Sequence, residues 1–530
     1  MDVCQNKNTM KENNSILVSN SIKDNQHNNE DLPLNQMATD ELKKNISQVT
    51  VSSVSISFGI LLTNLLLSIN LIYAGKLNDT NILSGIGLAN VMMNCSGAYM
   101  LQGLNQGFSS LGARAYGAGS KQLLYDYLFK AFFTIVKVTF FFGTFLIFQE
   151  EILLFLNQDP EVAYFAYLYG VQILIGMFFA FFFDCFRNYL NAIGIFNQPM
   201  YIQFLSVGFQ LSFCFLFVDC FKLGLTGICM ATNFTYFCSL ACIIYMMKRM
   251  NVLPDFSQFD KKSLLKGYSS YCKYVYPIAL PMVVDIFCFE INSILIGAMQ
   301  NKAYFSAHVI LCNIVSIFYS FPLGLGAALC TLISNAIGMN NKQRVKNLYK
   351  MSYFFGVLIG IFFLFIFTLY DVNLANLYTD EVYTVLNFLD IVSIYRLFVV
   401  LDNLQCSMQG ILKGVGLGDK CLKMFLVCYY VIGTPISCLL AFTFELELVG
   451  FWIGFCVAIS SIFYSQVHVL HYLNWDQQIE QEYLHVKKQK DMIELVEISQ
   501  NNGMDKVNDE DIENEIKENM ISSKFKNQNY

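Results

Sequence analysis

Long apolar runs constrain this chain more than any other feature of its sequence. Of its 530 residues, 55% are hydrophobic and only 14% are charged, whereas soluble globular proteins carry about a quarter charged residues. The hydrophobic residues gather in runs of the roughly 20 residues that a membrane-spanning helix needs. About twelve such runs follow one another, near 51–74, 82–114, 126–149, 160–190, 200–219, 222–247, 271–298, 304–337, 348–370, 381–411, 422–442 and 446–472. The sequence therefore predicts an all-α membrane protein with twelve transmembrane helices.

The two ends of the chain are polar. Residues 1–48 are rich in Asn and Lys and hold no apolar core of the signal-peptide kind. Residues 474–530 are charged. We expect both ends to be mobile tails, because each has too little apolar surface to fold alone. A short helix could form around 480–500.

Basic residues gather in alternate loops. If the N-terminus is cytosolic, the loops after the even-numbered helices are cytosolic too, and they hold Lys121, Lys248, Arg249, Lys261, Lys262, Lys266, Lys342, Arg344, Lys346 and Lys420. The opposite loops offer only Lys76, Lys222 and Lys302. Because loops rich in Lys and Arg stay in the cytosol, we expect both termini there. A plasma membrane and the membrane of an acidic internal compartment both fit this orientation.

The chain also contains an internal duplication. Four pairs of segments match in the same order: INLIYAGKLND at 69–79 with INSILIGAMQN at 291–301, SSLGARAYGAGSKQ at 109–122 with CTLISNAIGMNNKQ at 330–343, YLNAIGIFNQ at 189–198 with ILKGVGLGDK at 411–420, and LGLTGI at 223–228 with LELVGF at 446–451. The members of each pair start 221 to 223 residues apart. We interpret the chain as two six-helix bundles of the same orientation around a central cleft, which is typical of secondary transporters.

This repeat sets the domain boundaries. We expect an N-terminal tail at 1–48, a first half at 49–247, a cytosolic linker at 248–270, a second half at 271–473 and a C-terminal tail at 474–530. No GxxxxGK[ST] phosphate-binding loop occurs in the sequence, so ATP is not expected to drive transport within this chain.

Motifs in both halves resemble the multidrug and toxic compound extrusion (MATE) family of antiporters, of the eukaryotic type. They are NCSG at 94–97, GLNQGFSSLGARAYGAG at 103–119, LFLNQDPEV at 154–162, AHVILCNIVSIFYSFPLGLGAALCTLISNAIG at 307–338, GILKGVGLGD at 410–419 and YYVIGTP at 429–435. The resemblance spans all twelve predicted helices. It implies that the chain exports organic cations, drugs or metabolites in exchange for protons or sodium.

Three acids stand inside apolar runs of the second half. Asp285 and Glu290 lie in PMVVDIFCFEINSILIG, and Asp402 lies in VVLDNLQC. A charge at the bilayer centre costs about 2.5–3.5 kcal/mol and usually marks function. At the family's motifs, the acid pair on the seventh helix falls on Asp285 and Glu290, and the acid on the tenth helix falls on Asp402. An offset of 222 puts Thr63 and Ser68 of the first half opposite Asp285 and Glu290. The packing of a half therefore does not require acids at these positions.

These acids predict a coupling chemistry. Low dielectric disfavours an ionised carboxylate, so a carboxylate facing the cleft holds either a proton or an organic cation, and exchanging the two gives antiport. Asp285 and Glu290 cannot share one narrow face, because five residues turn a helix by about 140°. We expect one to face the cleft and the other to point towards the tenth helix. The alternative is that the acids pair structurally with Arg396, Lys413 or polar neighbours.

Five further residues are candidates for the substrate cleft. Asn94 could hydrogen-bond substrate or proton-bound water, or instead a neighbouring helix. Tyr319, Tyr429 and Tyr430 could present aromatic faces to an organic cation, or simply pack. Arg396 could clamp one of the acids or recognise an anionic substrate.

Other polar residues have structural interpretations. Asp184 and Arg187 lie three residues apart in FFFDCFRNYL, a spacing that favours an ion pair on one helix face. We interpret His308 as a core histidine with a satisfied partner. The seventeen cysteines lie mainly in the apolar runs and form no zinc or redox pattern, so they read as packing residues.

The expected partners are a small-molecule substrate, cationic in charge, and the lipid bilayer. We expect a monomer with no nucleic-acid partner, no metal and no cofactor besides the coupling ion, which is a proton or, alternatively, sodium. A lipid-linked precursor flippase would need basic residues for pyrophosphate, and the spans offer few apart from Arg396. An integral-membrane enzyme would need a His/Asp or Cys/His pair near the surface, which the sequence does not suggest.

Overall fold

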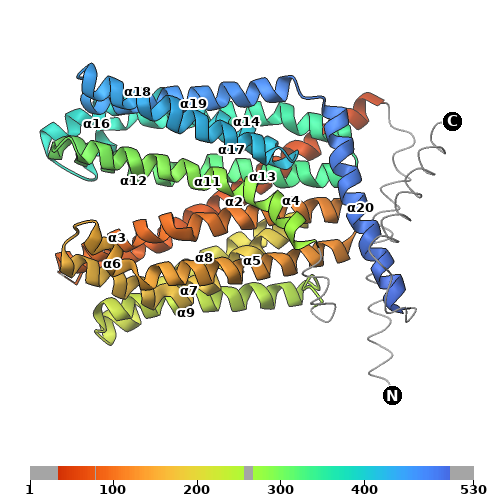
Figure 1. Ribbon diagram of the computed structural model, residues 1–530, viewed down its shortest axis with the longest axis horizontal. Coiled ribbons are helices and arrows are strands. Elements are labelled where there is room, and N and C mark those ends of the chain that lie inside the picture. Colours follow the sequence, from red (N-terminus) through yellow and green to blue (C-terminus); the bar gives the residue numbers. More distant parts are fainter. Residues whose placement is uncertain (1–33, 78, 256–266, 502–530) are drawn as a thin grey trace. The chain divides into compact units, whose positions relative to one another are not determined.

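The computed structural model describes residues 34–77, 79–255 and 267–501, and the side chains of residues 34–39 and 494–501 are outside this description. Helices account for almost all of the described chain, and no strand occurs in it (Figure 1). The chain divides after Thr50 into two compact units. The first unit contains the start of α2, and the packing described below concerns residues 51–501.

The helices of the first half precede the linker. They are α2 (Leu34–Gly75), α3 (Thr80–Met93), the π-helical turn η1 (Asn94–Ala98), α4 (Tyr99–Gly117), α5 (Lys121–Ile147), α6 (Gln149–Phe155), α7 (Pro160–Ala192), α8 (Asn197–Cys214), η2 (Phe215–Cys220) and α9 (Gly224–Arg249).

The helices of the second half follow the linker, and one more helix comes after them. They are α11 (Tyr268–Gly297), α12 (Lys302–Phe318), α13 (Ser320–Gly338), α14 (Lys342–Leu369), α15 (Asp371–Asn376), α16 (Val382–Gly414), α17 (Gly418–Leu426), η4 (Val427–Gly433), α18 (Thr434–Cys438), η5 (Leu439–Thr443), α19 (Glu447–His471) and α20 (Trp475–Asn501).

The predicted spans are present as helices. Eleven helical segments of the described chain are long and apolar enough to cross a membrane. The remaining predicted span is formed by α3, η1 and α4, which run from Thr80 to Gly117 and carry several polar residues and glycines. The all-α prediction with twelve spans is therefore confirmed.

The tails differ from expectation where they can be described. Residues 34–48, expected to belong to a tail, form the first turns of α2, and residues 475–501 form α20, which is longer than the short helix expected around 480–500. Both segments continue helical structure beyond the predicted apolar runs. The remaining tail residues, 1–33 and 502–530, lie outside the described residues, as does 256–266 of the linker.

Two hydrophobic cores lie mainly in the two halves, and the first core also includes Tyr271, Val275 and Ala279 of α11. In Figure 1 the helices α11–α19, coloured green to blue, lie together, and α3–α9, coloured orange to yellow-green, lie together. Buried side chains such as Phe108 and Phe142 belong to the first core, and Phe388 and Trp452 belong to the second. The two cores thus correspond largely to the two sequence repeats, and the predicted domain boundaries stay predictions.

The halves meet along α4, which packs against α13 and α11. A Cβ atom added to Gly117 would lie 2.3 Å from the carbonyl oxygen of Asn335, and one added to Gly338 would lie 2.1 Å from the carbonyl oxygen of Arg114. Small residues at helix crossings let membrane helices approach closely. The two glycines thus bring α4 and α13 into backbone contact.

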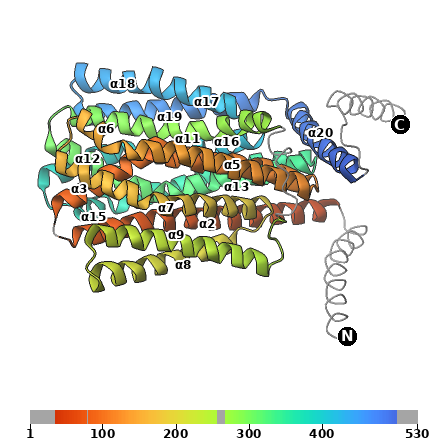
Figure 2. The same ribbon diagram turned by 60° about the horizontal axis from the view of Figure 1, so that its bottom comes forward.

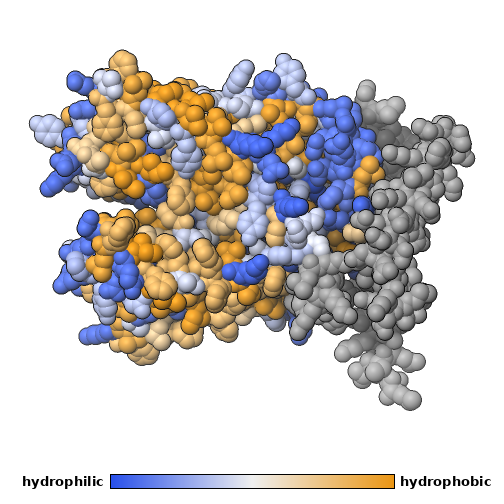
Figure 3. All heavy atoms as spheres, in the orientation of Figure 1, coloured by the Kyte–Doolittle hydropathy of each residue, from blue (hydrophilic) through white to orange (hydrophobic). Residues whose placement is uncertain are grey.

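This crossing lies at the end of the helices where α20 is found, which we call the α20 end. Figures 1 and 2 both show α20 running across the helix ends there. Figure 3 shows mostly hydrophobic helix flanks, a hydrophilic region around α20, and a hollow between the two halves at the opposite end. The two halves are thus in contact at the α20 end and separated at the other.

Candidate functional site

Asp285 is held by two tyrosines. It lies in α11, which contains Pro277 and Pro281, and its side chain is buried, with 9% exposure. The Tyr319 hydroxyl, at the junction of α12 and α13, donates to Oδ2 at 2.9 Å, and the Tyr429 hydroxyl, in η4, donates to Oδ1 at 2.5 Å. Both carboxylate oxygens are therefore fixed by neutral donors.

Asp402 completes the cluster from α16. It is 7% exposed, and Cys406 and Tyr319 connect it to Asp285. The Cys406 sulfur lies 4.0 Å from Asp402 Oδ1 and 3.9 Å from the Tyr319 hydroxyl. No ion pair reaches Asp285 or Asp402 in the part of the chain that the structure describes. Two neighbouring carboxylates without such a partner favour occupancy by a proton or a cation.

Glu290 lies apart from this cluster. It is half-buried on α11, five residues after Asp285, which places it on a different side of the helix. The structure thus brings Asp285 and Asp402 together, and Glu290 takes no part in the hydrogen bonds that hold Asp285.

The remaining cleft candidates take different positions. The Tyr430 hydroxyl donates to the Val284 carbonyl oxygen at 2.9 Å, one residue before Asp285. Asn94 begins η1 and is partly buried. The substrate roles of Asn94, Tyr319, Tyr429 and Tyr430 stay predictions.

Arg396 is paired elsewhere. Its guanidinium forms an ion pair with Asp371 of α15, and its Nε donates to the Phe367 carbonyl oxygen at 3.1 Å. The structure therefore places Arg396 with Asp371 and not with Asp285 or Asp402. The sequence did not indicate this pairing, because it arises only when the chain turns back at α15 and brings Asp371 beside α16.

Two structural interpretations are confirmed. Asp184 and Arg187 form the predicted ion pair, and Asn105 of α4 also donates to Asp184, at 2.7 Å. His308 is fully buried and lies 2.9 Å from the Ser293 hydroxyl. Neither the ion pair nor the histidine belongs to the Asp285 cluster.

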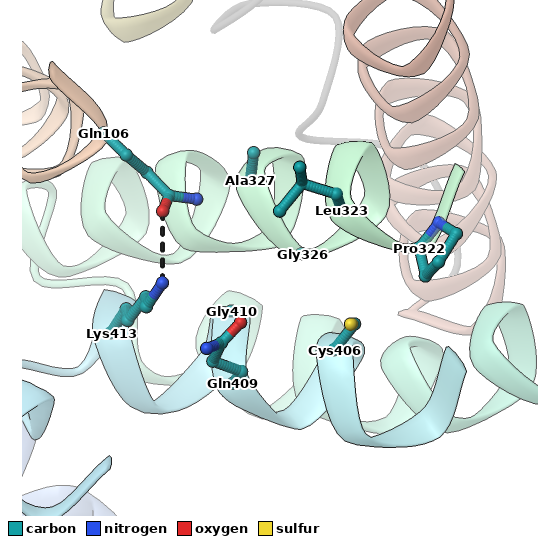
Figure 4. Close-up of a pocket in the computed structure, with 9 residues that line it drawn as sticks. All are labelled: Gln106, Pro322, Leu323, Gly326, Ala327, Cys406, Gln409, Gly410 and Lys413. Atoms are coloured by element: carbon teal, nitrogen blue, oxygen red, sulfur yellow. Dashed lines mark hydrogen bonds between the residues drawn. The ribbon is translucent and has the colours of Figure 1, made fainter. Parts of the chain in front are cut away.

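Lys413 forms part of a small pocket that joins the cluster to the first half. Lys413 is 2% exposed, and its ammonium group donates to the Gln106 side chain of α4 at 3.2 Å (Figure 4). The pocket is lined by residues of α4, α13 and α16: Gln106, Pro322, Leu323, Gly326, Ala327, Cys406, Gln409, Gly410 and Lys413. Lys413 lines this pocket together with Cys406 of the cluster, and it forms no ion pair with Asp285 in the described chain. Sequence reasoning considered Lys413 only as a partner of the acids.

The first half has no counterpart of the cluster. An offset of 222 places Thr63, Gly97, Ala180 and Val207 at the positions equivalent to Asp285, Tyr319, Asp402 and Tyr429. The Thr63 hydroxyl instead donates to the Gly59 carbonyl oxygen of its own helix at 2.9 Å. The arrangement is therefore specific to the second half, although both halves share the same helix packing.

One family model matches the chain twice. The MatE model matches residues 55–216 and residues 277–439. The two matches start 222 residues apart, which agrees with the offset of the internal repeat.

Several curated proteins are similar along most of the chain. An uncharacterized transporter of Schizosaccharomyces pombe is 26% identical over 411 residues, covering 77% of this chain and 75% of that protein. Protein DETOXIFICATION 49 of Arabidopsis thaliana is 25% identical, covering 82% of this chain and 87% of that protein. Multidrug and toxin extrusion protein 1 of Danio rerio is 25% identical, covering 77% of this chain and 69% of that protein.

Solved structures share the fold. The eukaryotic MATE transporter AtDTX14 superposes with a TM-score of 0.76 at 20% identity, covering 84% of this chain and 99% of that one. A multidrug resistance MATE family transporter in its outward-facing conformation gives a TM-score of 0.73 at 17% identity, covering 82% and 96%. At these identities the likeness concerns the fold alone.

Proposed function

This chain belongs to the MatE family, and from that premise we propose that it is a secondary active antiporter that exports organic cations, drugs or metabolites in exchange for protons. It is an integral, multi-pass membrane protein of a family of transporters. The coupling ion is then a proton, the substrate is cationic, and transport runs out of the cytosol.

The observation that carries the proposal is the pair of buried carboxylates, Asp285 and Asp402, in the second half. They are linked through Tyr319 and Cys406, and the hydrogen bonds to Asp285 come from the neutral hydroxyls of Tyr319 and Tyr429. Such a site is stabilised when a proton or a cationic guest neutralises it. Protons and organic cations then compete for one site, and this competition is the basis of exchange.

The orientation follows from the distribution of basic residues. Lys121 and Lys342 begin α5 and α14 at the α20 end, and loops rich in Lys and Arg stay in the cytosol. We infer that the α20 end faces the cytosol. The hollow between the halves at the other end then opens towards the outside or the lumen, where protons enter and substrate leaves.

Alternating access supplies the rest of the cycle. Protonation from the outer side displaces the cation, and the halves then close at that end and part at the α20 end. The proton leaves to the cytosol, and the ionised carboxylates bind the next cation. We expect most helices of each half to move as a body, because two separate cores hold them, while the beginning of α11 packs in the first core.

Transport in vesicles of defined composition tests this mechanism. The full chain is reconstituted, a fluorescent organic cation is loaded, and efflux is recorded under an imposed pH gradient or an imposed sodium gradient. We expect the pH gradient to drive efflux, and we expect Asp285→Asn and Asp402→Asn each to reduce gradient-driven efflux at least about tenfold, which corresponds to about 1.4 kcal/mol.

The matched control is Asp419→Asn, which removes an exposed acid in the same half and should leave efflux unchanged. Efflux that follows the sodium gradient would replace the proton with sodium as the coupling ion. Efflux indifferent to both gradients would reject antiport. Full coupling in both Asp285→Asn and Asp402→Asn would reject the site.

A further inference from the structure

The helix α20 is docked by one face. Ile479 and Val486 are fully buried and lie seven residues apart, which places them two turns apart on the same side of the helix. Glu482 lies between them, and its side chain is 19% exposed. This face therefore combines two apolar contacts with one acid.

The beginning of α20 contacts the second half. The Trp475 ring lies 4.8 Å from the Tyr349 ring of α14, centroid to centroid, and the Gln478 amide donates to the Val415 carbonyl oxygen at 3.0 Å. Two exposed ion pairs add to these contacts, Lys346–Asp476 and Lys342–Glu480, each with a separation of 3.0 Å. Exposed ion pairs of this kind contribute little to stability.

The later part of α20 contacts the first half. The Tyr127 hydroxyl of α5 donates to the side chain of Gln489, and the Lys490 ammonium donates to the Ala118 carbonyl oxygen at 3.4 Å. Val486 belongs to the hydrophobic core of the first half, and Ile493 packs against that core. One helix thus bridges both halves.

Arg114 lies where the first half, the second half and α20 meet. It is fully buried in α4 and forms an ion pair with Glu482 of α20. It also donates to the Gly414 carbonyl oxygen of α16 at 2.7 Å, and its guanidinium lies 4.9 Å from the centre of the Tyr274 ring. Removing one partner of a buried ion pair is strongly destabilising, because the other charge stays buried without compensation. Glu482 is therefore the contact on which this junction depends.

We propose that α20 is a strap that holds the two halves together at the α20 end, and that its first-half contacts, centred on Arg114 and Glu482, release when the halves part there. The strap follows α19 after a short link at residues 472–474, so it is tied covalently to the second half. Its contacts with α4 and α5 are consequently the ones that must break. The consequence for transport rests on the alternating access proposed above.

Hydrogen–deuterium exchange tests the strap on the full chain in lipid nanodiscs, without substrate or ion gradient. In Glu482→Gln we expect exchange to accelerate at least tenfold in residues 475–490. We also expect faster exchange at the end of α4 (residues 113–120) and at the end of α13 (residues 335–342), because the halves lose the element that binds them. Tyr127→Phe deletes a single hydroxyl and should accelerate exchange in the same segments by a smaller factor. If Glu482→Gln does not fold, the exchange rates of Tyr127→Phe test the strap instead.

The matched control is Asp491→Asn, which removes an acid of the same helix that makes no ion pair in the described chain, and which should exchange like the unchanged protein. Faster exchange in α20 alone, with the ends of α4 and α13 unaffected, would overturn the proposal, and so would no acceleration anywhere. Because the measurement needs no transport, a failure of the strap and a failure of antiport are distinguishable.

Discussion

Ser109 of α4 and Thr331 of α13 face each other with hydroxyl oxygens 3.2 Å apart, and their separation of 222 residues differs by one from the offset of 221 between the repeat segments 109–122 and 330–343. The Asn335 amide reaches the Ala113 carbonyl oxygen at 3.4 Å across the same separation of 222 residues. Residues at positions next to equivalent ones in the two halves therefore meet at the crossing of α4 and α13. The approximate symmetry axis passes through this crossing, so a change there acts on both halves at once.

Gly338→Ala should open this crossing. The added methyl group would lie 2.1 Å from the Arg114 carbonyl oxygen and 2.9 Å from its carbonyl carbon, and backbone cannot yield as a flexible side chain can. Overpacking of this kind costs typically about 1–3 kcal/mol, so the state closed at the α20 end loses population by roughly tenfold or more. Cys330, buried in α13 beside Ser110 of the first half, reports this change, because its alkylation by a maleimide should accelerate. Peptide mass spectrometry resolves it from the other cysteines.

The control for this prediction is Gly208→Ala in α8, where an added Cβ meets no atom within 4 Å. This variant should leave the alkylation rate of Cys330 unchanged. If Gly338→Ala also leaves it unchanged, the glycine crossing does not hold the halves closed.

The sequence predicted the features that are local in the chain. The twelve spans follow from the length of apolar runs, and the repeat follows from motifs at a constant offset. Asp285 and Asp402 could be singled out because an acid in an apolar run is costly without a function. These inferences need no knowledge of which helices pack together.

The features that depend on packing were missed. Tyr319 and Tyr429 were considered as aromatic faces for a cation, yet their hydroxyls donate to Asp285. The contact of Arg114 with Glu482 joins residues 368 positions apart, so no periodicity in the sequence could reveal it. Because this contact could not be foreseen, the sequence predicted a C-terminal tail where the structure has the docked helix α20.

Tyr429→Phe should change how transport depends on pH. The Tyr429 hydroxyl donates to Asp285 at 2.5 Å, and a hydrogen bond to a charged group contributes about 1.5–3 kcal/mol. Because this donor stabilises the ionised carboxylate, its removal favours the protonated form. We expect the pH of half-maximal efflux to move to more alkaline values by roughly 1–2 pH units, measured in the same vesicles over a series of symmetrical pH values.

The control is Tyr430→Phe, the neighbouring residue, whose hydroxyl donates to a backbone carbonyl and not to a carboxylate. Its pH profile should superpose on that of the unchanged protein. Equal shifts in the two variants, or none in Tyr429→Phe, would contradict a role of the Tyr429 hydroxyl in coupling.

Arg396→Gln should affect stability and leave substrate preference unchanged. Its ion pair with Asp371 has side chains 29% and 21% exposed, so a coupling energy of up to about 1 kcal/mol is expected. A double-mutant cycle with Asp371→Asn, followed by thermal unfolding in detergent, measures this coupling. A change in the relative transport of cationic and anionic dyes in Arg396→Gln, with no coupling to Asp371, would instead indicate a role in substrate recognition.

Lys413→Met should strengthen the binding of a cationic substrate. Lys413 is buried in the pocket that Cys406 of the cluster also lines, so its positive charge opposes a second cation at the carboxylates. Its removal should lower the KM for an organic cation roughly 3- to 10-fold, where tenfold corresponds to about 1.4 kcal/mol. It should also lower the maximal rate, because a tightly held cation leaves slowly. Replacing a buried charge with an apolar side chain of similar volume is often neutral for stability, so the thermal unfolding midpoint should not fall.

The matched control is Lys423→Met, which removes an exposed lysine of α17. It should change neither KM nor the maximal rate, since water screens an exposed charge. A higher KM in Lys413→Met would show that the lysine supports binding, as expected of a site for anionic substrates. An unchanged KM together with a lower unfolding midpoint would show that Lys413 has no part in substrate recognition. Its role would then be structural, through the hydrogen bond to Gln106 that links the two halves.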